Sequence, residues 1–101
     1  MEYLDPAVIR GEMPSRATDI YALGATLHRA LSGTSLYGEL PSNNTMLAMR
    51  KVLSHEPELS ASLPPGAREV IAAAINPDPA ARPATAAELA DRIAAINDDV
   101  L

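Results

Sequence analysis

Apolar residues are densest between positions 18 and 32, where the chain would be apolar almost all the way round a helix. The run opens with an acid, Asp19, and is followed by Gly33. A negative charge in the first turn suits the helix dipole, and glycine favours the left-handed turn that ends a helix. Because a helix without a polar face must be surrounded by protein, we expect a helix over 18–32 at the centre of the fold.

Three further segments place apolar residues at helical spacing. Asn43 or Asn44 can cap the first, which runs to about residue 54. Pro65 starts the second, which runs to about residue 75, and a capping box over 85–88 opens the third. A short helical turn is also expected over 6–10. The faces expected to be apolar are, in chain order, Met46, Met49 and Leu53; then Val70, Ile71, Ala74 and Ile75; then Ala86, Leu89, Ala90, Ile93 and Ile96.

No segment shows the strict alternation that is typical of a half-buried strand, and prolines interrupt the chain between 76 and 83. The sequence therefore predicts an all-α fold with four main helices, of which the apolar helix is central. We expect residues 1–97 to form this unit and residues 98–101 to be a frayed tail.

Composition narrows the classes of function. The chain has 101 residues and a formal net charge of −5, which gives no support to a nucleic-acid or anionic-membrane partner. It has no Cys, which excludes disulfides, zinc–thiolate sites and thiol catalysis. No leader pattern opens the chain and no apolar run is long enough to span a bilayer. We therefore expect a soluble, cytoplasmic protein.

Three local patterns follow one another in a familiar order. The segment 2–9 reads EYLDPAVI, the start of the apolar helix at 19–24 reads DIYALG, and the proline-rich turn at 76–83 reads NPDPAARP. Together they resemble the Ala-Pro-Glu region, the start of helix F and the Asp-Pro-x-x-Arg-Pro turn of protein kinases. The resemblance is closest to bacterial Ser/Thr kinases of the eukaryotic-like type, and it runs over nearly the whole chain.

The resemblance implies a fold and a function. The four helices would be helices F to I in the C-terminal part of the kinase large lobe, an incomplete kinase fold. Asp19, Gly24 and Arg82 would be structural motif residues, with Asp19 accepting hydrogen bonds from the backbone of the catalytic loop. The parent domain would use ATP and Mg²⁺ to phosphorylate Ser or Thr in proteins. This chain would act at most as a scaffold or a docking part.

The motifs that carry out phosphoryl transfer are missing from the sequence. It has no glycine-rich loop, no His-Arg-Asp motif and no Asp-Phe-Gly motif, and its single Lys, Lys51, lies on a predicted helix. We therefore expect no catalytic, cofactor-binding or metal-binding residue in this chain. The missing N-terminal kinase portion or another protein would be the partner, and the bare face of the central helix could also drive self-association. The alternative is a free-standing, non-catalytic interaction module, a pseudokinase remnant.

One departure from the family pattern concerns Arg82. In the family a Glu at the third position of Ala-Pro-Glu pairs with this Arg, and here that position is Ala7. An unpaired buried guanidinium would be costly. The sequence leaves four alternatives: Asp5, Glu2 or water satisfies Arg82, or Arg82 is exposed.

The remaining candidate residues have ordinary explanations beside their functional ones. Met46 and Met49 could form a partner-docking surface, because Met adapts to varied contacts, but core packing is the favoured interpretation. His28 is expected to be a hydrogen-bonded or partly exposed helix histidine rather than a metal ligand or base. His55 lies in a predicted loop beside two Glu residues, where a metal site has no support from ligand spacing.

Overall fold

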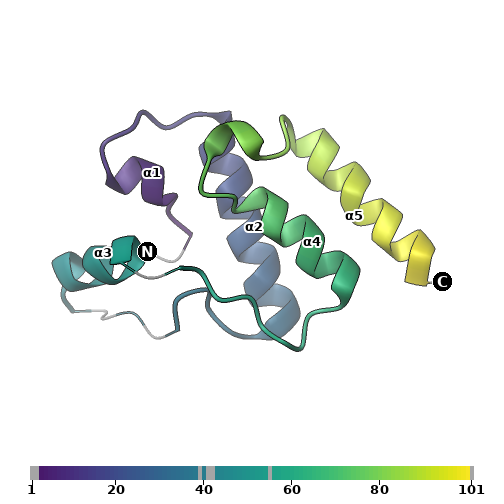
Figure 1. Cartoon of the computed structure of the whole chain (residues 1–101), viewed down its shortest axis with the longest axis horizontal. Helices are drawn as coiled ribbons and strands as arrows, with labels where there is room; N and C mark the ends of the chain where they lie inside the picture. Colours follow the sequence, from purple (N-terminus) through teal and green to yellow (C-terminus); the bar gives the residue numbers. More distant parts are fainter. Residues whose placement is uncertain (1–2, 39, 41–42, 55, 101) are drawn as a thin grey trace.

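The computed structural model describes residues 3–38, 40, 43–54 and 56–100. Over these residues the chain is helical, with no strand, as the sequence predicted. The elements follow in the order α1 (Pro6–Ile9), α2 (Arg16–Ser32), α3 (Thr45–Ser54), α4 (Pro65–Ala74), the 3₁₀ turn η1 (Pro79–Ala81) and α5 (Ala86–Val100). In Figure 1, α2 lies in the middle, α4 and α5 lie on one side of it, and α1 and α3 lie on the other.

Helix α2 is the predicted apolar helix, and it begins two residues earlier than expected. Its start is fixed by a hydrogen bond of 2.9 Å from the backbone N–H of Ser15 to the hydroxyl of Thr18. It ends at Gly33, whose φ of 74° is left-handed and whose N–H donates to the carbonyl of Arg29 at 2.8 Å. Glycine adopts this φ without strain, so the predicted stop is confirmed.

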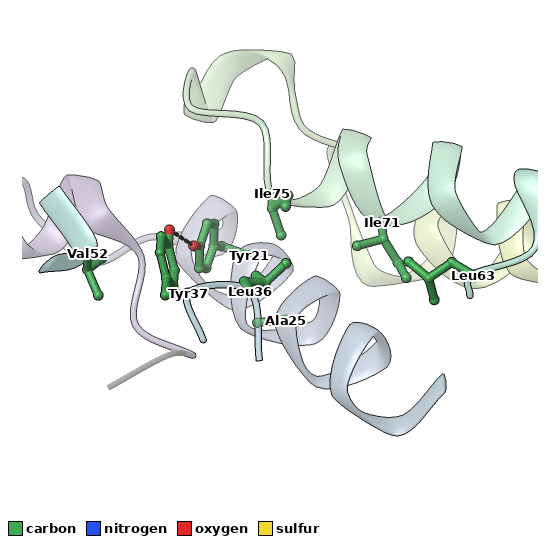
Figure 2. Close-up of a cluster of buried hydrophobic side chains, with 8 residues drawn as sticks. All are labelled: Tyr21, Ala25, Leu36, Tyr37, Val52, Leu63, Ile71 and Ile75. Atoms are coloured by element: carbon green, nitrogen blue, oxygen red, sulfur yellow. Dashed lines mark hydrogen bonds between the residues drawn. The ribbon is translucent and has the colours of Figure 1, made fainter. Parts of the chain in front are cut away.

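Helices α2 and α4 cross in direct contact at Gly24. A Cβ placed on Gly24 would lie 2.8 Å from the Cβ of Ala74 and 2.9 Å from a methyl of Ile75. Only a residue without a side chain allows this approach. The contact brings the apolar face of α4 against the buried face of α2, and Figure 2 shows the resulting core, formed by Tyr21, Ala25, Leu36, Tyr37, Val52, Leu63, Ile71 and Ile75.

The prediction for α4 is confirmed, because Val70, Ile71, Ala74 and Ile75 are all buried. The face of α5 is narrower than predicted. Leu89 is buried, and Ile93 and Ile96 are partly buried against α2 and α4, whereas Ala86 and Ala90 are exposed. Burying an alanine side chain removes little apolar area from water, so the larger Leu and Ile side chains decide how α5 packs.

Helix α5 continues to Val100, so the backbone is helical across 98–100. The frayed tail expected over 98–101 stays a prediction. Leu101 lies outside the described residues.

Helix α3 packs through a different face from the one predicted. Its buried residues are Ala48 and Val52, whereas Met46 is 75% exposed and Leu53 is 41% exposed. The interpretation of Met46 as a core residue is therefore wrong, and Met49 is only partly buried. Helix α3 lies beside the short α1 at the edge of the molecule, where there is too little protein to cover a wide apolar face. The Asn44 side chain caps this helix by accepting from the N–H of Leu47 at 3.1 Å.

None of the described helices combines the length and the apolar character that a bilayer crossing requires.

Candidate functional site

The proline-rich turn carries Arg82 into the interior. Asp78 caps η1 by accepting from the N–H of Ala80 at 3.0 Å, and the prolines on either side restrict the backbone. Arg82 follows η1 in an extended conformation and is only 6% exposed. The alternative in which Arg82 is exposed is therefore wrong.

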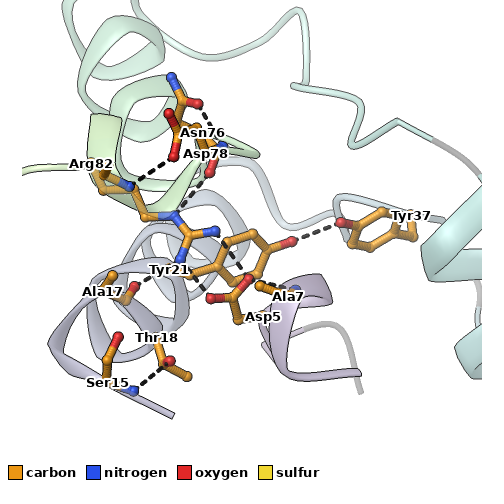
Figure 3. A network of polar contacts seen from close by, with 11 residues as sticks. Asp5, Ala7, Ser15, Ala17, Thr18, Tyr21, Tyr37, Asn76, Asp78 and Arg82 are labelled. Carbon is orange, nitrogen blue, oxygen red and sulfur yellow. Dashed lines mark hydrogen bonds and ion pairs between the residues drawn. The ribbon is translucent and has the colours of Figure 1, made fainter. Parts of the chain in front are cut away.

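Arg82 is paired with Asp5 across 77 positions of sequence. One guanidinium nitrogen, Nη1, donates to Asp5 Oδ2 at 2.6 Å, and the other, Nη2, donates to Asp5 Oδ1 at 3.0 Å (Figure 3). Asp5 itself is 1% exposed and caps α1 by accepting from the N–H of Ala7 at 3.0 Å. The sequence-based alternative in which Asp5 satisfies Arg82 is confirmed, and Glu2 lies outside the described residues.

The guanidinium makes further contacts that join separate parts of the chain. Its Nε donates to the carbonyl of Asn76 at 2.9 Å, and its Nη1 donates to the carbonyl of Ala17 in α2 at 3.0 Å. Its central carbon lies 5.1 Å from the centre of the Tyr21 ring, within the range of a cation–π contact. Arg82 thus ties the N-terminal segment, α2 and the turn before α5 together at one point.

Two tyrosines extend this network toward α3. The hydroxyls of Tyr21 and Tyr37 lie 2.7 Å apart and form a buried hydrogen bond. Burial raises the pKa of both hydroxyls, so both are neutral at ordinary pH. We refer to Asp5, Tyr21, Tyr37 and Arg82 as the buried polar cluster. Among the described residues, no buried side-chain nitrogen or oxygen lacks a hydrogen-bond partner.

The charge of Asp5 depends on Arg82. Burial alone would raise the pKa of Asp5, but the hydrogen bonds from Arg82 and from the N–H of Ala7, together with the Arg82 charge, outweigh it. The net result is a pKa below the ordinary value of 3.8. Asp5 is therefore an ionised carboxylate at neutral pH, and the cluster contains one full ion pair.

The lowered pKa of Asp5 predicts how the free energy of unfolding falls at acid pH, which we call the acid limb. A carboxyl group with a lower pKa in the folded state stabilises the fold above its unfolded pKa, and that contribution is lost as pH falls through the folded pKa. We expect the free energy of unfolding to decline below about pH 4, and Asp5→Asn to flatten this decline. Urea unfolding at a series of pH values measures it. The control is Glu88→Gln. The N–H of Ala84 and Arg92 also lower the pKa of Glu88, but Glu88 lies at an exposed position. An unchanged acid limb in Asp5→Asn would contradict the assignment.

Asp19 and Gly24 lie outside the buried polar cluster, and Gly24 is buried where α2 crosses α4. Asp19 is exposed in the first turn, and its carboxylate makes no hydrogen bond or ion pair with any described residue. Farther along α2, Leu23 is 42% exposed, whereas Leu31, at 55%, borders an apolar cavity with residues of α4 and α5. We call Asp19 and Leu23 the bare face of α2. That α2 exposes a contiguous apolar patch stays a prediction.

His28 is a structural residue, as the sequence predicted. It is fully buried, its Nε2 accepts from the N–H of Ser60 at 3.0 Å, and its Nδ1 lies 3.1 Å from the carbonyl of Thr34. An imidazole that accepts at Nε2 carries its proton at Nδ1, which then donates to Thr34. Among the described residues, no group of three His, Asp or Glu could hold a metal ion, and His55 lies outside them.

Met46 and Met49 line a groove of about 510 Å³ between α1 and α3. The most exposed of its large apolar side chains are Met46, at 75%, and Leu47, at 49%. Ile9, Leu53, Asn44, Arg50 and Ser54 complete its walls. We call this surface the α3 groove.

Comparison with known proteins shows which proteins this chain is similar to. It is 34% identical to the serine/threonine-protein kinase PknK of Mycobacterium tuberculosis over 90 residues, which is 87% of this chain and 8% of PknK. It is 30% identical over 95 residues, or 94% of this chain, to the serine/threonine-protein kinase PknA of the same species and to the serine/threonine-protein kinase drp72 of Corynebacterium efficiens. The chain is homologous to part of bacterial Ser/Thr protein kinases. It spans 22% of the length of PknA and 18% of that of drp72. No family model matches it.

For a kinase relative, the pairing of Arg82 is unusual. The resemblance places the usual acid at position 7, where this chain has Ala7, and the structure places the paired carboxylate two residues earlier. Both positions lie at the start of α1, so the ion pair forms at this same point of the fold although its acid is two residues earlier in the sequence. The charge is retained although the motif is not.

Sequence reasoning missed the Tyr21–Tyr37 hydrogen bond. A weak signal existed, because a tyrosine on the buried side of an apolar helix needs a partner for its hydroxyl. Nothing local pointed to Tyr37, which lies 16 positions away in a loop.

Proposed function

We propose that this chain is the C-terminal, substrate-side part of a Ser/Thr protein kinase domain, and that a separate N-terminal portion supplies ATP binding and catalysis. The complete domain would transfer the γ-phosphate of ATP to Ser or Thr in a protein. The chain itself acts as a scaffold for the catalytic loop and as a docking part. Its homology to kinases supports its place in a kinase domain. Its lack of the phosphoryl-transfer motifs supports the proposal that another part supplies ATP binding and catalysis.

The observation that carries this proposal is the bare face of α2. A central helix that is buried on one side and exposes Leu23 on the other has an apolar side chain left to cover. Asp19, exposed at the N-terminal end of this face, can accept backbone hydrogen bonds from a loop that lies across it. Both features suit a helix that supports a second structural part.

Association with a kinase N-terminal portion tests the proposal. The probe is the part of M. tuberculosis PknA that precedes the matched region, mixed with the full chain and analysed by calorimetry. We expect binding, and we expect Leu23→Lys to weaken it by about tenfold or more because a charge would be buried in the contact. Met46→Lys is the matched control, since Met46 is also an exposed apolar residue but lies on α3. Absence of binding, or equal loss in both variants, would count against the proposal.

The same face predicts the behaviour of the isolated chain. We expect it to self-associate through Leu23, and Leu23→Lys to shift it toward the monomer in light scattering. Added Mg-ATP is expected to leave the melting temperature of the chain unchanged. A saturable increase would instead indicate a nucleotide site.

Docking is the second role in the proposal, and it rests on the α3 groove. Met46 and Leu47 are apolar residues that the fold leaves exposed in a concave surface. A stable monomer has no structural need for such residues, whereas a protein-binding surface does.

A further inference from the structure

We infer that the cavity beside the buried polar cluster binds a small neutral molecule that combines an apolar body with one hydrogen-bond acceptor, as an aryl ketone does. The acceptor takes the hydroxyl proton that the Tyr21–Tyr37 pair leaves unused. The site does not depend on the kinase role proposed above.

The cavity has a volume of about 260 Å³ and is lined by residues of the N-terminal segment, α2, α3 and the turn before α5. All four members of the buried polar cluster line it, and each is at most 6% exposed. Sites for drug-sized ligands have volumes of about 300–1,000 Å³, so this cavity suits a smaller molecule.

The two tyrosines have one hydroxyl proton more than their mutual hydrogen bond uses. Each hydroxyl carries one proton, and the 2.7 Å contact between Tyr21 and Tyr37 takes only one of the two, whichever residue donates (Figure 3). Burial raises the pKa of both hydroxyls, so both protons stay in place. Among the described residues, neither hydroxyl makes another hydrogen bond. A buried O–H without an acceptor is unfavourable, so the pair favours a ligand that brings an acceptor into the cavity.

The other walls of the cavity set the rest of the ligand. Most are apolar, and they come from Val52, Leu53, Ile75, Pro6, Pro57 and Pro77. The charged residues among the described lining residues balance. Asp5 and Arg82 pair with each other, while Arg10 and Glu56 are exposed and opposite in sign. Because neither sign prevails among these residues, a neutral apolar body suits the cavity better than an ion.

Two small molecules of matched shape test the inference. Acetophenone carries a carbonyl oxygen beside its phenyl ring, and isopropenylbenzene carries a CH₂ group in place of that oxygen. Titration of the full, isotope-labelled chain, followed by amide NMR shifts, measures both affinity and location. We expect acetophenone to bind about fivefold more tightly, as one net hydrogen bond between neutral groups implies. The shifts should centre on Tyr37, Val52 and Arg82.

Variants test the role of the hydroxyls. The double variant Tyr21→Phe, Tyr37→Phe removes both of them, and we expect it to lose the preference for acetophenone. Replacing both partners of a hydrogen bond with apolar groups of the same shape can be nearly neutral for stability, so this variant should fold. Either single variant keeps one hydroxyl proton and should keep most of the preference. Tyr3→Phe is the matched control, because Tyr3 is the third tyrosine of the chain and is not among the described residues that line the cavity.

Three results would overturn the inference. Equal affinities of the two compounds for the unmodified chain would show that no hydroxyl recognises the acceptor. Shifts centred on Leu27, Leu31 and Ile96 would place the ketone in the separate apolar cavity of about 310 Å³ between α2, α4 and α5. The absence of saturable shifts would leave water as the acceptor. If the double variant does not fold, the comparison of the two compounds on the unmodified chain and the single variants decides.

Discussion

Replacing Arg82 with methionine is expected to lower the free energy of unfolding by about 3–5 kcal/mol, because the substitution leaves the Asp5 carboxylate buried without its counter-charge. Asp5 is 1% exposed and cannot recover hydration without opening the N-terminal segment. The same change removes the hydrogen bonds to Asn76 and Ala17 that hold the turn before α5 against α2. Urea unfolding followed by circular dichroism measures the loss.

A double-mutant cycle isolates the ion pair. We expect Asp5→Ala and Arg82→Ala each to be strongly destabilising, and the double variant to lose clearly less than the sum, because neither charge is then left alone. The exposed Arg92–Glu88 pair is the matched control, and Arg92→Ala should cost less than about 1 kcal/mol. Losses that add fully would show that Asp5 does not stabilise Arg82. If the alanine variants do not fold, Arg82→Lys, which keeps the charge but not the two-pronged contact, gives an intermediate loss to compare.

Gly24→Ala is expected to have the second largest effect, a loss of about 2 kcal/mol. The new methyl would meet the Cβ of Ala74 at 2.8 Å, and that atom cannot rotate away because it is fixed to the backbone of α4. Overpacking of this kind costs up to about 3 kcal/mol, whereas the better helix propensity of Ala returns about 1 kcal/mol. The steric cost is the larger, so the variant is destabilised. Its melting temperature and urea midpoint both report the change.

Rescue distinguishes this contact from a general intolerance of substitution. Ala74→Gly removes the Cβ that a methyl on Gly24 would meet, so the double variant Gly24→Ala, Ala74→Gly should regain part of the stability lost in Gly24→Ala. Ala74→Gly alone should be destabilising by about 1 kcal/mol because glycine weakens a helix interior. A stabilising effect of Gly24→Ala would contradict the close crossing of α2 and α4.

The sequence predicted the helices well because their ends carry local chemical signals. Gly33 requires no information from elsewhere in the chain to stop α2, and Asn44 caps α3 from the position directly before the helix. The side chain of Thr85 likewise accepts from the N–H of Glu88 at 3.0 Å, as a capping box requires. Signals of this kind depend on neighbours a few residues apart, which is the range over which a sequence can be interpreted directly.

The faces of the helices were harder to predict, and α3 shows why. Periodicity located an apolar stripe through Met46, Met49 and Leu53, but burial depends on how much protein lies beside the helix. Because α3 lies at the edge against the short α1, only the narrow side with Ala48 and Val52 is covered. The periodicity of apolar residues indicates which side of a helix is apolar, and the neighbouring elements decide whether that side is buried.

The buried polar cluster marks the limit of prediction from sequence. The Ala at position 7 leaves the partner of Arg82 open in the sequence, with Asp5, Glu2, water or an exposed Arg82 as the alternatives. The choice of Asp5 depends on the path of α1 relative to a turn 77 positions away, which local patterns do not encode. The contact between Tyr21 and Tyr37 is non-local for the same reason.

Phosphoryl transfer by a reconstituted domain tests the central claim, that this chain is the substrate-side part of a Ser/Thr kinase domain. The measurement is transfer of labelled phosphate from Mg-ATP to Ser or Thr of a protein substrate by the N-terminal portion of PknA, with and without this chain. We expect no transfer by the chain alone, transfer when both parts are present, and a lower rate with Asp19→Ala. Transfer by the chain alone, or a rate that the chain does not increase, would contradict it.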